Sequence, residues 1–497
     1  MKRFFLLLSI LLSTFVIYFF AKDRWMGYET IPDNKIFDER NYALQGISLR
    51  TNGMPIGWSD SSEYMKMPAN VKSTNLSGFS ILVNGIKPAL SNLKSFPYPV
   101  FSVNEFDFGF GKQHLKFVQP FLDHPPLGGL IYSLGISKNA KIFTDIKPAD
   151  YRKPALFLAI ITSILLFALV FQTFNNPFIA TLCVIVYNSV PTYLLVTRYA
   201  LLENLVAPLV LLMLNLLLLA YRLRKKRKTS LLLYISAGLI SGLTILAKES
   251  GIGFILGAVI LLIIYKAEKK KIFTFVATLL IPILIYLIWG WYYFPALFGK
   301  ILIFNASRGF LGSLNFINIF SSIGFTNFPF DGWWIWGFIS IIFLFYSGRK
   351  IAIPLTIPFL CGLFTILFFG SVNYPWYFFA LIPFLAAASG YALWKLITDP
   401  DPVLLATFFL FALSSSFYWG YTVFHLPPSS LVYRILITVF AGAGTLRIIF
   451  SKKRVVTVGW AAAFSLLIFE VIKWNNFSIL YIIANWGKLA IPSFPIL

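Results

Sequence analysis

The chain has 497 residues, of which 58% are hydrophobic and only 12% are charged, and its formal net charge at pH 7 is +23. These proportions exclude an ordinary soluble domain, because the apolar residues form blocks that are long enough to cross a bilayer. Lys and Arg residues form short runs between those blocks, which is typical of membrane topology signals and not of a nucleic-acid-binding surface.

The N-terminal segment resembles a signal peptide, since Lys2 and Arg3 precede an apolar block at 4–21. It lacks a small-x-small cleavage site, so we interpret it as an uncleaved first span. A membrane helix needs about 20 apolar residues, and the whole chain then contains about thirteen such helices. They are predicted near residues 4–21, 154–174, 177–196, 201–220, 230–247, 250–265, 272–291, 333–347, 351–370, 376–395, 403–421, 431–450 and 455–473.

Basic residues predict the orientation of these helices. If the N-terminus is cytoplasmic, the turns with the basic runs at 222–228, 266–271, 349–350 and 452–454 are cytoplasmic too, as the positive-inside rule requires. The other face then carries the polar loops, and the few cysteines and lack of a retention signal favour a prokaryotic plasma membrane. The predicted parts are a first membrane helix (1–21), an extracytoplasmic loop (22–153), a first helical group (154–291), a second extracytoplasmic loop (292–332) and a C-terminal helical group (333–497).

One short segment and the residues that could bind a metal complete the organisation of the chain. The segment 123–132 is apolar but too short to span, and a proline lies near its start, so we predict a helix lying on the membrane surface. Cys183 and Cys361 both lie inside apolar blocks, so the sequence predicts neither a disulfide framework nor a thiolate metal site. The three histidines are too scattered to indicate a metal site by spacing.

Charged residues near the predicted outer boundaries are the candidate functional residues. A charge at the centre of a membrane helix costs roughly 2.5–3.5 kcal/mol and less near its ends, so such residues tend to mark cavities or ion pairs. The alternatives are a helix N-cap for the first acidic pair and interfacial snorkelling for the others. The candidates are Asp38, Glu39, Arg152, Arg198, Glu203, Lys248 and Glu249.

This set suits the transfer of a sugar from a lipid phosphate. The phosphate is already a good leaving group, so the site needs cations for the phosphate and one carboxylate that deprotonates an acceptor hydroxyl. Asp38 is the predicted base, and attack opposite the phosphate would invert the anomeric centre. Arg152, Arg198, Lys248 and His124 are the predicted phosphate ligands. No nucleotide-binding motif is present, which fits a donor that arrives from the membrane.

Five short motifs on the predicted outer face resemble those of the GT-C superfamily of glycosyltransferases. Within it, the protein O-mannosyltransferases and the lipid A aminoarabinose transferases are the most similar. The motifs are FDERNY at 37–42, HPPLG at 124–128, RYALLE at 198–203, AKESG at 247–251 and YPWY at 374–377. The resemblance covers roughly residues 1–395 and leaves the last three spans unassigned.

The resemblance implies a GT-C fold, an all-α integral membrane protein with a conserved module of about seven helices and a catalytic aspartate in the first outer loop. Carried over to this sequence, Asp38 is the base and Glu39 is its neighbour or an acceptor contact. The implied substrate contacts are Tyr42, Glu203, Glu249, Tyr374, Trp376 and Tyr377. Two departures stand out: Glu203 lies where the family usually has Asp, and the first loop holds an insertion of about 80 residues.

The implied activity is inverting transfer of a hexose or pentose from a polyprenyl- or dolichyl-phosphate donor to a hydroxyl of a protein, lipid or glycan. No cofactor is required and no metal ligand is assigned, while assistance by a divalent cation is left open. The implied partners are the lipid-linked sugar, its acceptor and membrane lipids, without nucleic acid. One alternative is a multi-pass transporter or lipid flippase, which predicts ionisable residues in mid-span or broken helices. Another is a non-catalytic scaffold.

Overall fold

The computed structural model describes most of the chain. The described residues are 2–29, 37–59, 61–64, 100–107, 112–137, 140, 145–307, 332–369, 375–417, 430–450 and 453–485. Every structural statement below concerns these ranges, and Tyr374 lies outside them.

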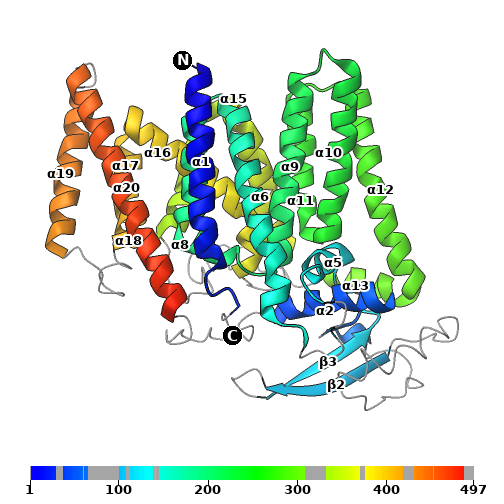
Figure 1. Ribbon diagram of the computed structural model, residues 1–497. Helices are drawn as coiled ribbons and strands as arrows, with labels where there is room; N and C mark the ends of the chain where they lie inside the picture. Colours follow the sequence, from blue (N-terminus) through cyan, green and yellow to red (C-terminus); the bar gives the residue numbers. More distant parts are fainter. Residues whose placement is uncertain are drawn as a thin grey trace.

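Helices dominate the architecture, and in the described ranges nine segments are long and apolar enough to cross a membrane (Figure 1). They lie in α1 (Lys2–Trp25), α6 (Pro148–Phe174), α9 (Leu202–Arg222), α10 (Arg227–Ala247), α12 (Lys269–Tyr293), α15 (Gly332–Phe369), η5 with α16 (Pro375–Leu381 and Ile382–Thr398), α19 (Ser430–Ile449) and α20 (Arg454–Asn485). Shorter apolar segments are α7 (Pro177–Ser189), η4 with α11 (Glu249–Gly251 and Ile252–Ile264), α13 (Pro295–Ala306), the first part of α15 (Gly332–Ser347) and the α17, η6 and α18 run (Pro402–Thr407, Phe408–Leu413 and Ser414–Phe417). The predicted helical membrane architecture is confirmed, whereas the count of about thirteen spans stays a prediction.

The element α15 contains two of the predicted spans, and it folds back on itself between them. The ring centroids of Phe338 and Phe359 lie 5.8 Å apart. In a straight helix, their separation of 21 positions in the sequence would place them about 31 Å apart, at 1.5 Å per residue. The two halves of α15 therefore pack against each other, and the predicted boundary near residues 349–350 coincides with the reversal.

One predicted span is broken by proline. The segment near 177–196 forms α7 and a short helix α8 (Pro191–Val196), separated by Val190 in an extended conformation. Proline has no backbone N–H to donate, and it disfavours helical geometry in the residue before it. The break brings α8 and the residues after it to the end of the bundle where the candidate site lies.

Short elements gather at one end of the bundle, opposite the N-terminus (Figure 1). They are α2 (Phe37–Asn52), α5 (Pro126–Ser133) and a three-stranded antiparallel sheet in the order β1-β3-β2, made of Gly57–Trp58, Lys112–Gln119 and Val100–Asp107. In the sheet, Val100 pairs with Gln119 and Trp58 pairs with Phe117. The predicted surface segment 123–132 contains all of α5 except its last residue, Ser133. The strands were not predicted.

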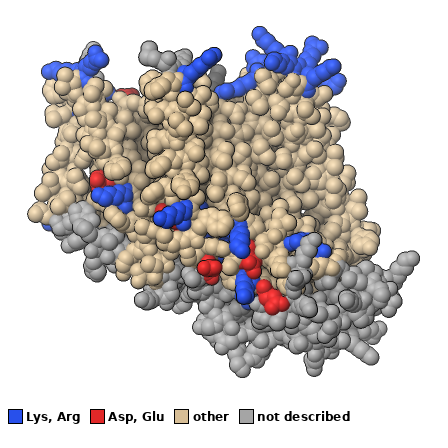
Figure 2. All heavy atoms as spheres, in the orientation of Figure 1, with Lys and Arg blue, Asp and Glu red and all other residues tan. Residues whose placement is uncertain are grey.

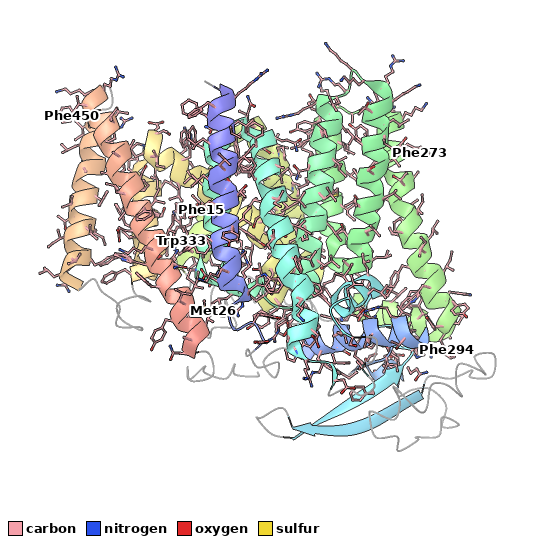
Figure 3. The ribbon with its side chains drawn as sticks, in the orientation of Figure 1. Phe15, Met26, Phe273, Phe294, Trp333 and Phe450 are labelled. Carbon is pink, nitrogen blue, oxygen red and sulfur yellow. The ribbon has the colours of Figure 1, made fainter. Side chains whose placement is uncertain are left out.

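The surface has the distribution expected of a membrane protein. Figure 2 shows Lys and Arg side chains gathered at the end where α9 meets α10, and uncharged atoms over the middle of the molecule. Apolar side chains such as Phe15 and Phe273 project outward from that middle zone (Figure 3), with 61% and 73% of their surface exposed. Exposed aromatic residues in such numbers are stable against lipid and unfavourable in water.

Candidate active site

The first turn of α2 carries the acidic pair of the FDERNY motif. Asp38 and Glu39 both lie in that turn, where carboxylates interact favourably with the helix dipole. Tyr42 follows one turn after Asp38 on the same helix face. It is buried, and the edge of its ring packs on His124 with 5.4 Å between centroids. These contacts place Asp38 on the side of α2 that faces α5.

Tyr42 lies near several acidic residues. Burial raises the pKa of its phenol well above the usual value, and the charges of Asp38, Glu203 and Glu249 raise it further, together with Tyr377. Three of the predicted site carboxylates, from α2, α9 and η4, therefore lie around one phenol. The phenol stays protonated at pH 7 and is a hydrogen-bond donor beside them.

Lys248 provides the cation of this cluster. It follows the last residue of α10 with an extended backbone, and its ammonium forms a buried ion pair with Glu203 at the start of α9. The same ammonium lies 3.9 Å from the centroid of the Tyr377 ring, which is a favourable cation–π contact. Within the described ranges, the second carboxylate oxygen of Glu203, Oε2, has no hydrogen-bond partner although it is buried.

Glu39 makes a different set of contacts from Asp38. Its carboxylate accepts hydrogen bonds from Arg152, with Nη2–Oε2 at 2.5 Å and Nε–Oε1 at 3.0 Å. It also accepts one from the backbone N–H of Ala200 at 2.6 Å. Arg152 in turn donates from Nη1 to the carbonyl of Tyr28 at 3.0 Å. Both side chains of the ion pair are fully buried, so Glu39 joins α2 to the first turns of α6 and to the segment before α9.

Arg198 is a further buried arginine near the ion pair of Glu39 and Arg152. Its Nη2 donates to the carbonyl of Met26 at 2.5 Å, whereas Nε and Nη1 have no hydrogen-bond partner within the described ranges. Burial lowers the pKa of its guanidinium to about 9, and the nearby charges of Arg152 and Arg24 lower it too. Arg198 therefore lies near two other buried arginines, Arg152 and Arg24.

Two residues of this region were missed by the sequence analysis. Arg24 is fully buried at the end of α1 and donates from Nε to Thr197 Oγ1 at 3.0 Å and from Nη1 to Asn188 Oδ1. Its signal was a basic residue at the outer end of a span, where the positive-inside rule disfavours one. Tyr286 in α12 donates to Glu249 Oε1 at 3.5 Å, and nothing in its apolar surroundings in the sequence distinguished it.

Two more of the predicted residues, His124 and Trp376, lie at the edge of the cluster. His124 contacts both Tyr42 and Phe121, and its backbone carbonyl accepts a hydrogen bond from Gln45 at 2.9 Å. Trp376 is half-buried in η5, with its ring 6.5 Å from that of Tyr377. In the part of the chain that the structure describes, no three His, Cys, Asp or Glu side chains are placed to hold a metal ion.

The helices and this cluster define a multi-pass membrane protein with a polar site where the ends of several helices meet. Residues 123–291 match the sequence model of the family described as dolichyl-phosphate-mannose-protein mannosyltransferase. The match covers about a third of the chain, and it begins after Asp38 and includes Arg152 and Lys248. It confirms the predicted resemblance to the GT-C superfamily, of mannosyltransferase type.

Solved structures give more distant likenesses. The apo structure of ArnT from Cupriavidus metallidurans is 14% identical with a TM-score of 0.47, covering 73% of this chain and 67% of that chain. The same protein bound to undecaprenyl phosphate gives 13% identity and a TM-score of 0.46, with 73% and 68% covered. The archaeal oligosaccharyltransferase AglB from Archaeoglobus fulgidus, in complex with an inhibitory peptide and a dolichol-phosphate, is 12% identical with a TM-score of 0.42. That match covers 90% of this chain and 56% of that chain. No curated protein matches the chain.

Proposed function

We propose that the protein is an inverting glycosyltransferase that moves a hexose or pentose from a polyprenyl-phosphate donor to a hydroxyl acceptor. The family match is to enzymes described by a lipid-phosphate sugar donor and a protein acceptor. For this chain the acceptor is a hydroxyl of a protein, lipid or glycan. The reaction takes place at the end of the bundle that carries α2 and α5, which is the extracytoplasmic face of the plasma membrane in the proposed orientation.

One observation carries the proposal. Asp38, Glu203, Lys248 and Glu249 come from three separate parts of the sequence, and all of them lie around Tyr42 and Tyr377. A structural ion pair alone would explain Glu203 with Lys248. It would not explain two further carboxylates beside a buried phenol at the outer end of the helices, because like charges at such a position are unfavourable without a function.

Asp38 has the features of a general base. It is the half-buried carboxylate of the acidic pair, so an acceptor hydroxyl can reach it, whereas Glu39 is fully buried. The ion pair with Arg152 and the hydrogen bond from Ala200 favour a positioning role for Glu39 and Arg152 in place of direct contact with substrate. They hold the first turn of α2 and so fix the direction of the Asp38 side chain.

Lys248 is the proposed ligand of the donor phosphate. Its ammonium is already balanced by Glu203, and a phosphate has the charge to compete for it. The Tyr377 ring can hold the ammonium in place while its anionic partner changes. In this proposal His124 lies near the same phosphate, and the charge of Arg198 adds to the positive potential at the site. Tyr42, Glu249, Trp376 and Tyr374 remain proposed contacts to the sugar or acceptor.

The test is sugar release from radiolabelled polyprenyl-phosphate hexoses and pentoses by the purified full-length protein, with a crude membrane fraction as acceptor. We expect Asp38→Asn to lower the turnover by about 10² or more, because it removes the general base. The matched control is Asp150→Asn. Asp150 also lies in the first turn of a helix, where it forms a partly exposed ion pair with Lys153 at 3.3 Å.

The outcomes separate the candidate functions. Full activity of Asp38→Asn would show that Asp38 is not the base, even if the protein is a transferase. If folded wild-type protein consumes none of the donors, the transferase proposal fails and transport or flipping of a lipid replaces it. An equal loss in Asp150→Asn and Asp38→Asn would mean that both substitutions disturb the fold.

A further inference from the structure

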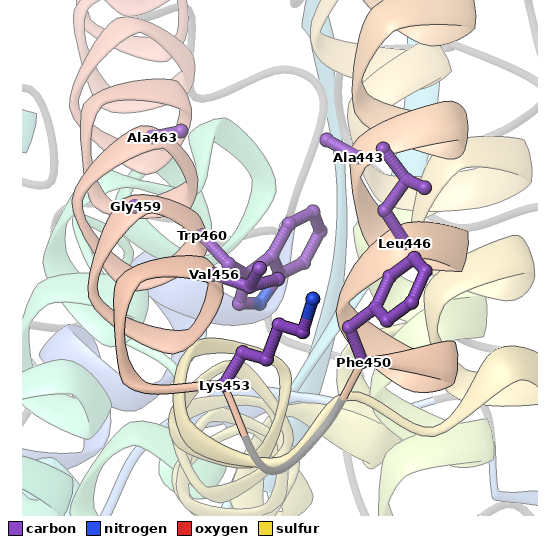
Figure 4. A pocket seen from close by; sticks show the side chains of 8 residues that line it. All are labelled: Ala443, Leu446, Phe450, Lys453, Val456, Gly459, Trp460 and Ala463. Atoms are coloured by element: carbon purple, nitrogen blue, oxygen red, sulfur yellow. The ribbon is translucent and has the colours of Figure 1, made fainter.

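A cavity of about 400 Å³ lies between α19 and α20, at the opposite end of the bundle from the candidate active site. Its volume is within the roughly 300–1,000 Å³ of typical small-molecule sites. Seven of the eight residues that line it are apolar or glycine, and the eighth is a lysine (Figure 4). They are Ala443, Leu446, Phe450, Lys453, Val456, Gly459, Trp460 and Ala463.

Small residues and one fixed aromatic ring shape this cavity. A Cβ atom added at Gly459 would meet no atom of the described residues within 4 Å, so the glycine leaves open space at the cavity wall. Trp460 forms the wall towards α16, because its Nε1 donates to the carbonyl of Leu396 at 2.6 Å. Leu446 and Phe450 are 53% and 41% exposed. In a membrane helix such exposure means contact with lipid, so the cavity opens towards the bilayer.

Lys453 gives the cavity its charge. Figure 4 shows its side chain directed into the space between the two helices, and its Nζ lies 5.0 Å from the centroid of the Phe450 ring. Within the described ranges, Lys453 forms no ion pair with a carboxylate. Lys453 follows three residues after Phe450, which Figure 3 labels at the end where Lys and Arg gather in Figure 2. This end corresponds to the level of lipid headgroups.

We propose that this cavity, a groove that opens towards the bilayer, binds one anionic glycerophospholipid from the leaflet at the basic face. Its phosphate lies on the Lys453 ammonium, and one acyl chain lies along the apolar wall made by Leu446, Val456 and Trp460. The apolar lining accounts for the chain, and the lysine accounts for the charge of the headgroup. Because the groove is at the other end of the bundle, this inference does not depend on the proposed transferase activity.

The experiment is native mass spectrometry of the full-length protein in detergent, titrated with phosphatidylglycerol or with phosphatidylcholine of the same acyl chains. We expect wild-type protein to retain one phosphatidylglycerol at concentrations where phosphatidylcholine is largely absent, with a preference of about fivefold. Lys453→Gln removes that preference, and Gly459→Leu lowers retention of both lipids by filling the groove.

Two control variants match these substitutions. Arg434→Gln removes an equal charge from the other end of α19. Gly442→Leu adds the same side chain at a glycine of α19, where a Cβ also meets no atom of the described residues within 4 Å. Both controls should behave like wild-type protein, and a melting temperature for each variant identifies any that is misfolded.

Three results would overturn the proposal. They are equal retention of the two lipids by wild-type protein, an unchanged preference in folded Lys453→Gln, and equal retention by folded Gly459→Leu and Gly442→Leu. A competition with undecaprenyl phosphate completes the test. If it displaces phosphatidylglycerol at equal concentration and itself requires Lys453, the occupant is a polyprenyl phosphate and the phospholipid assignment is wrong.

Discussion

Glu39 and Arg152 form a fully buried ion pair at the candidate site, supported by two hydrogen bonds to backbone groups of other residues. The protein loses far more stability when one partner of such a buried pair is removed than when both are replaced by apolar residues. Removing one partner leaves the other charge buried without compensation. This asymmetry separates a positioning role from direct participation in the reaction. It also gives a prediction that requires no substrate.

We expect Glu39→Gln to lower the free energy of unfolding by about 3–5 kcal/mol, since it leaves the Arg152 charge buried. The double variant Glu39→Leu with Arg152→Leu should recover part of that loss. Melting temperatures in detergent measure both effects. The control is Glu268→Gln, which removes a 71% exposed carboxylate from its pair with Lys271 and should change the melting temperature far less. A wild-type melting temperature for Glu39→Gln would contradict the positioning role.

At this scale, the sequence predicted which residues gather but not how they pair. The motifs and the outer boundaries selected Asp38, Glu203, Lys248 and Glu249, and the structure brings these four together. The partners could not be predicted, because they depend on the rotation of each helix about its axis. Arg24 was missed for a similar reason: in the sequence it is one charge at the end of a span, and only packing shows that it is buried.

At the scale of elements, α2 and α5 approach each other at two glycines. A Cβ at Gly46 would lie 1.8 Å from the carbonyl oxygen of Gly129, and a Cβ at Gly129 would lie 2.8 Å from the carbonyl oxygen of Tyr42. These neighbours are backbone atoms that cannot rotate away. The contact fixes the distance between the helix that carries Asp38 and the helix that follows His124.

We therefore expect Gly46→Ala to separate α2 from α5 and to displace the acidic pair from the rest of the site. Displacements of about 1 Å can lower turnover by about 10², and sugar release measures this loss. The matched control is Gly299→Ala in α13, where a Cβ meets no atom within 4 Å and helix propensity favours alanine. Unchanged turnover of Gly46→Ala would show that the close approach of the two helices is not needed.

Hydrophobic blocks predicted the membrane helices well, because burial in lipid requires long apolar segments whatever their neighbours. The strands at 100–107 and 112–119 were not predicted. Their residues do not alternate between apolar and polar, as Val100 and Phe101 are adjacent and so are Phe117 and Val118. The division of one predicted span at Pro191 was also missed, although proline is a known helix breaker, because the apolar block continues through it.

At the scale of the whole molecule, the two ends of the bundle differ in charge. One end gathers basic residues, and the other carries α2, α5, the sheet and the candidate site (Figures 1 and 2). The positive-inside rule then predicts that the basic end is cytoplasmic. This orientation decides whether an acceptor must come from outside the cell.

Labelling of single cysteines tests the orientation. Lys226→Cys, in the α9–α10 turn, should resist a membrane-impermeant maleimide in intact cells and react after permeabilisation. Lys300→Cys in α13 should react in intact cells, because residue 300 is exposed at the end of the bundle that carries the candidate site. Native Cys183 and Cys361 lie within the bundle, so the unsubstituted protein provides the background. The reverse pattern would place the site in the cytoplasm.

The bonds of Glu39 also constrain how the chain is assembled during synthesis. Its partners, Arg152 and the N–H of Ala200, are 113 and 161 residues further along the chain. At roughly 5–20 residues per second, the ribosome needs roughly 10 to 30 s to supply the second of them. Before Arg152 is made, the Glu39 carboxylate has neither of these partners, and before Ala200 is made it lacks the second. The helix α2 is thus made early, and its contacts are completed late, after α5, α6, α7 and α8 have been made.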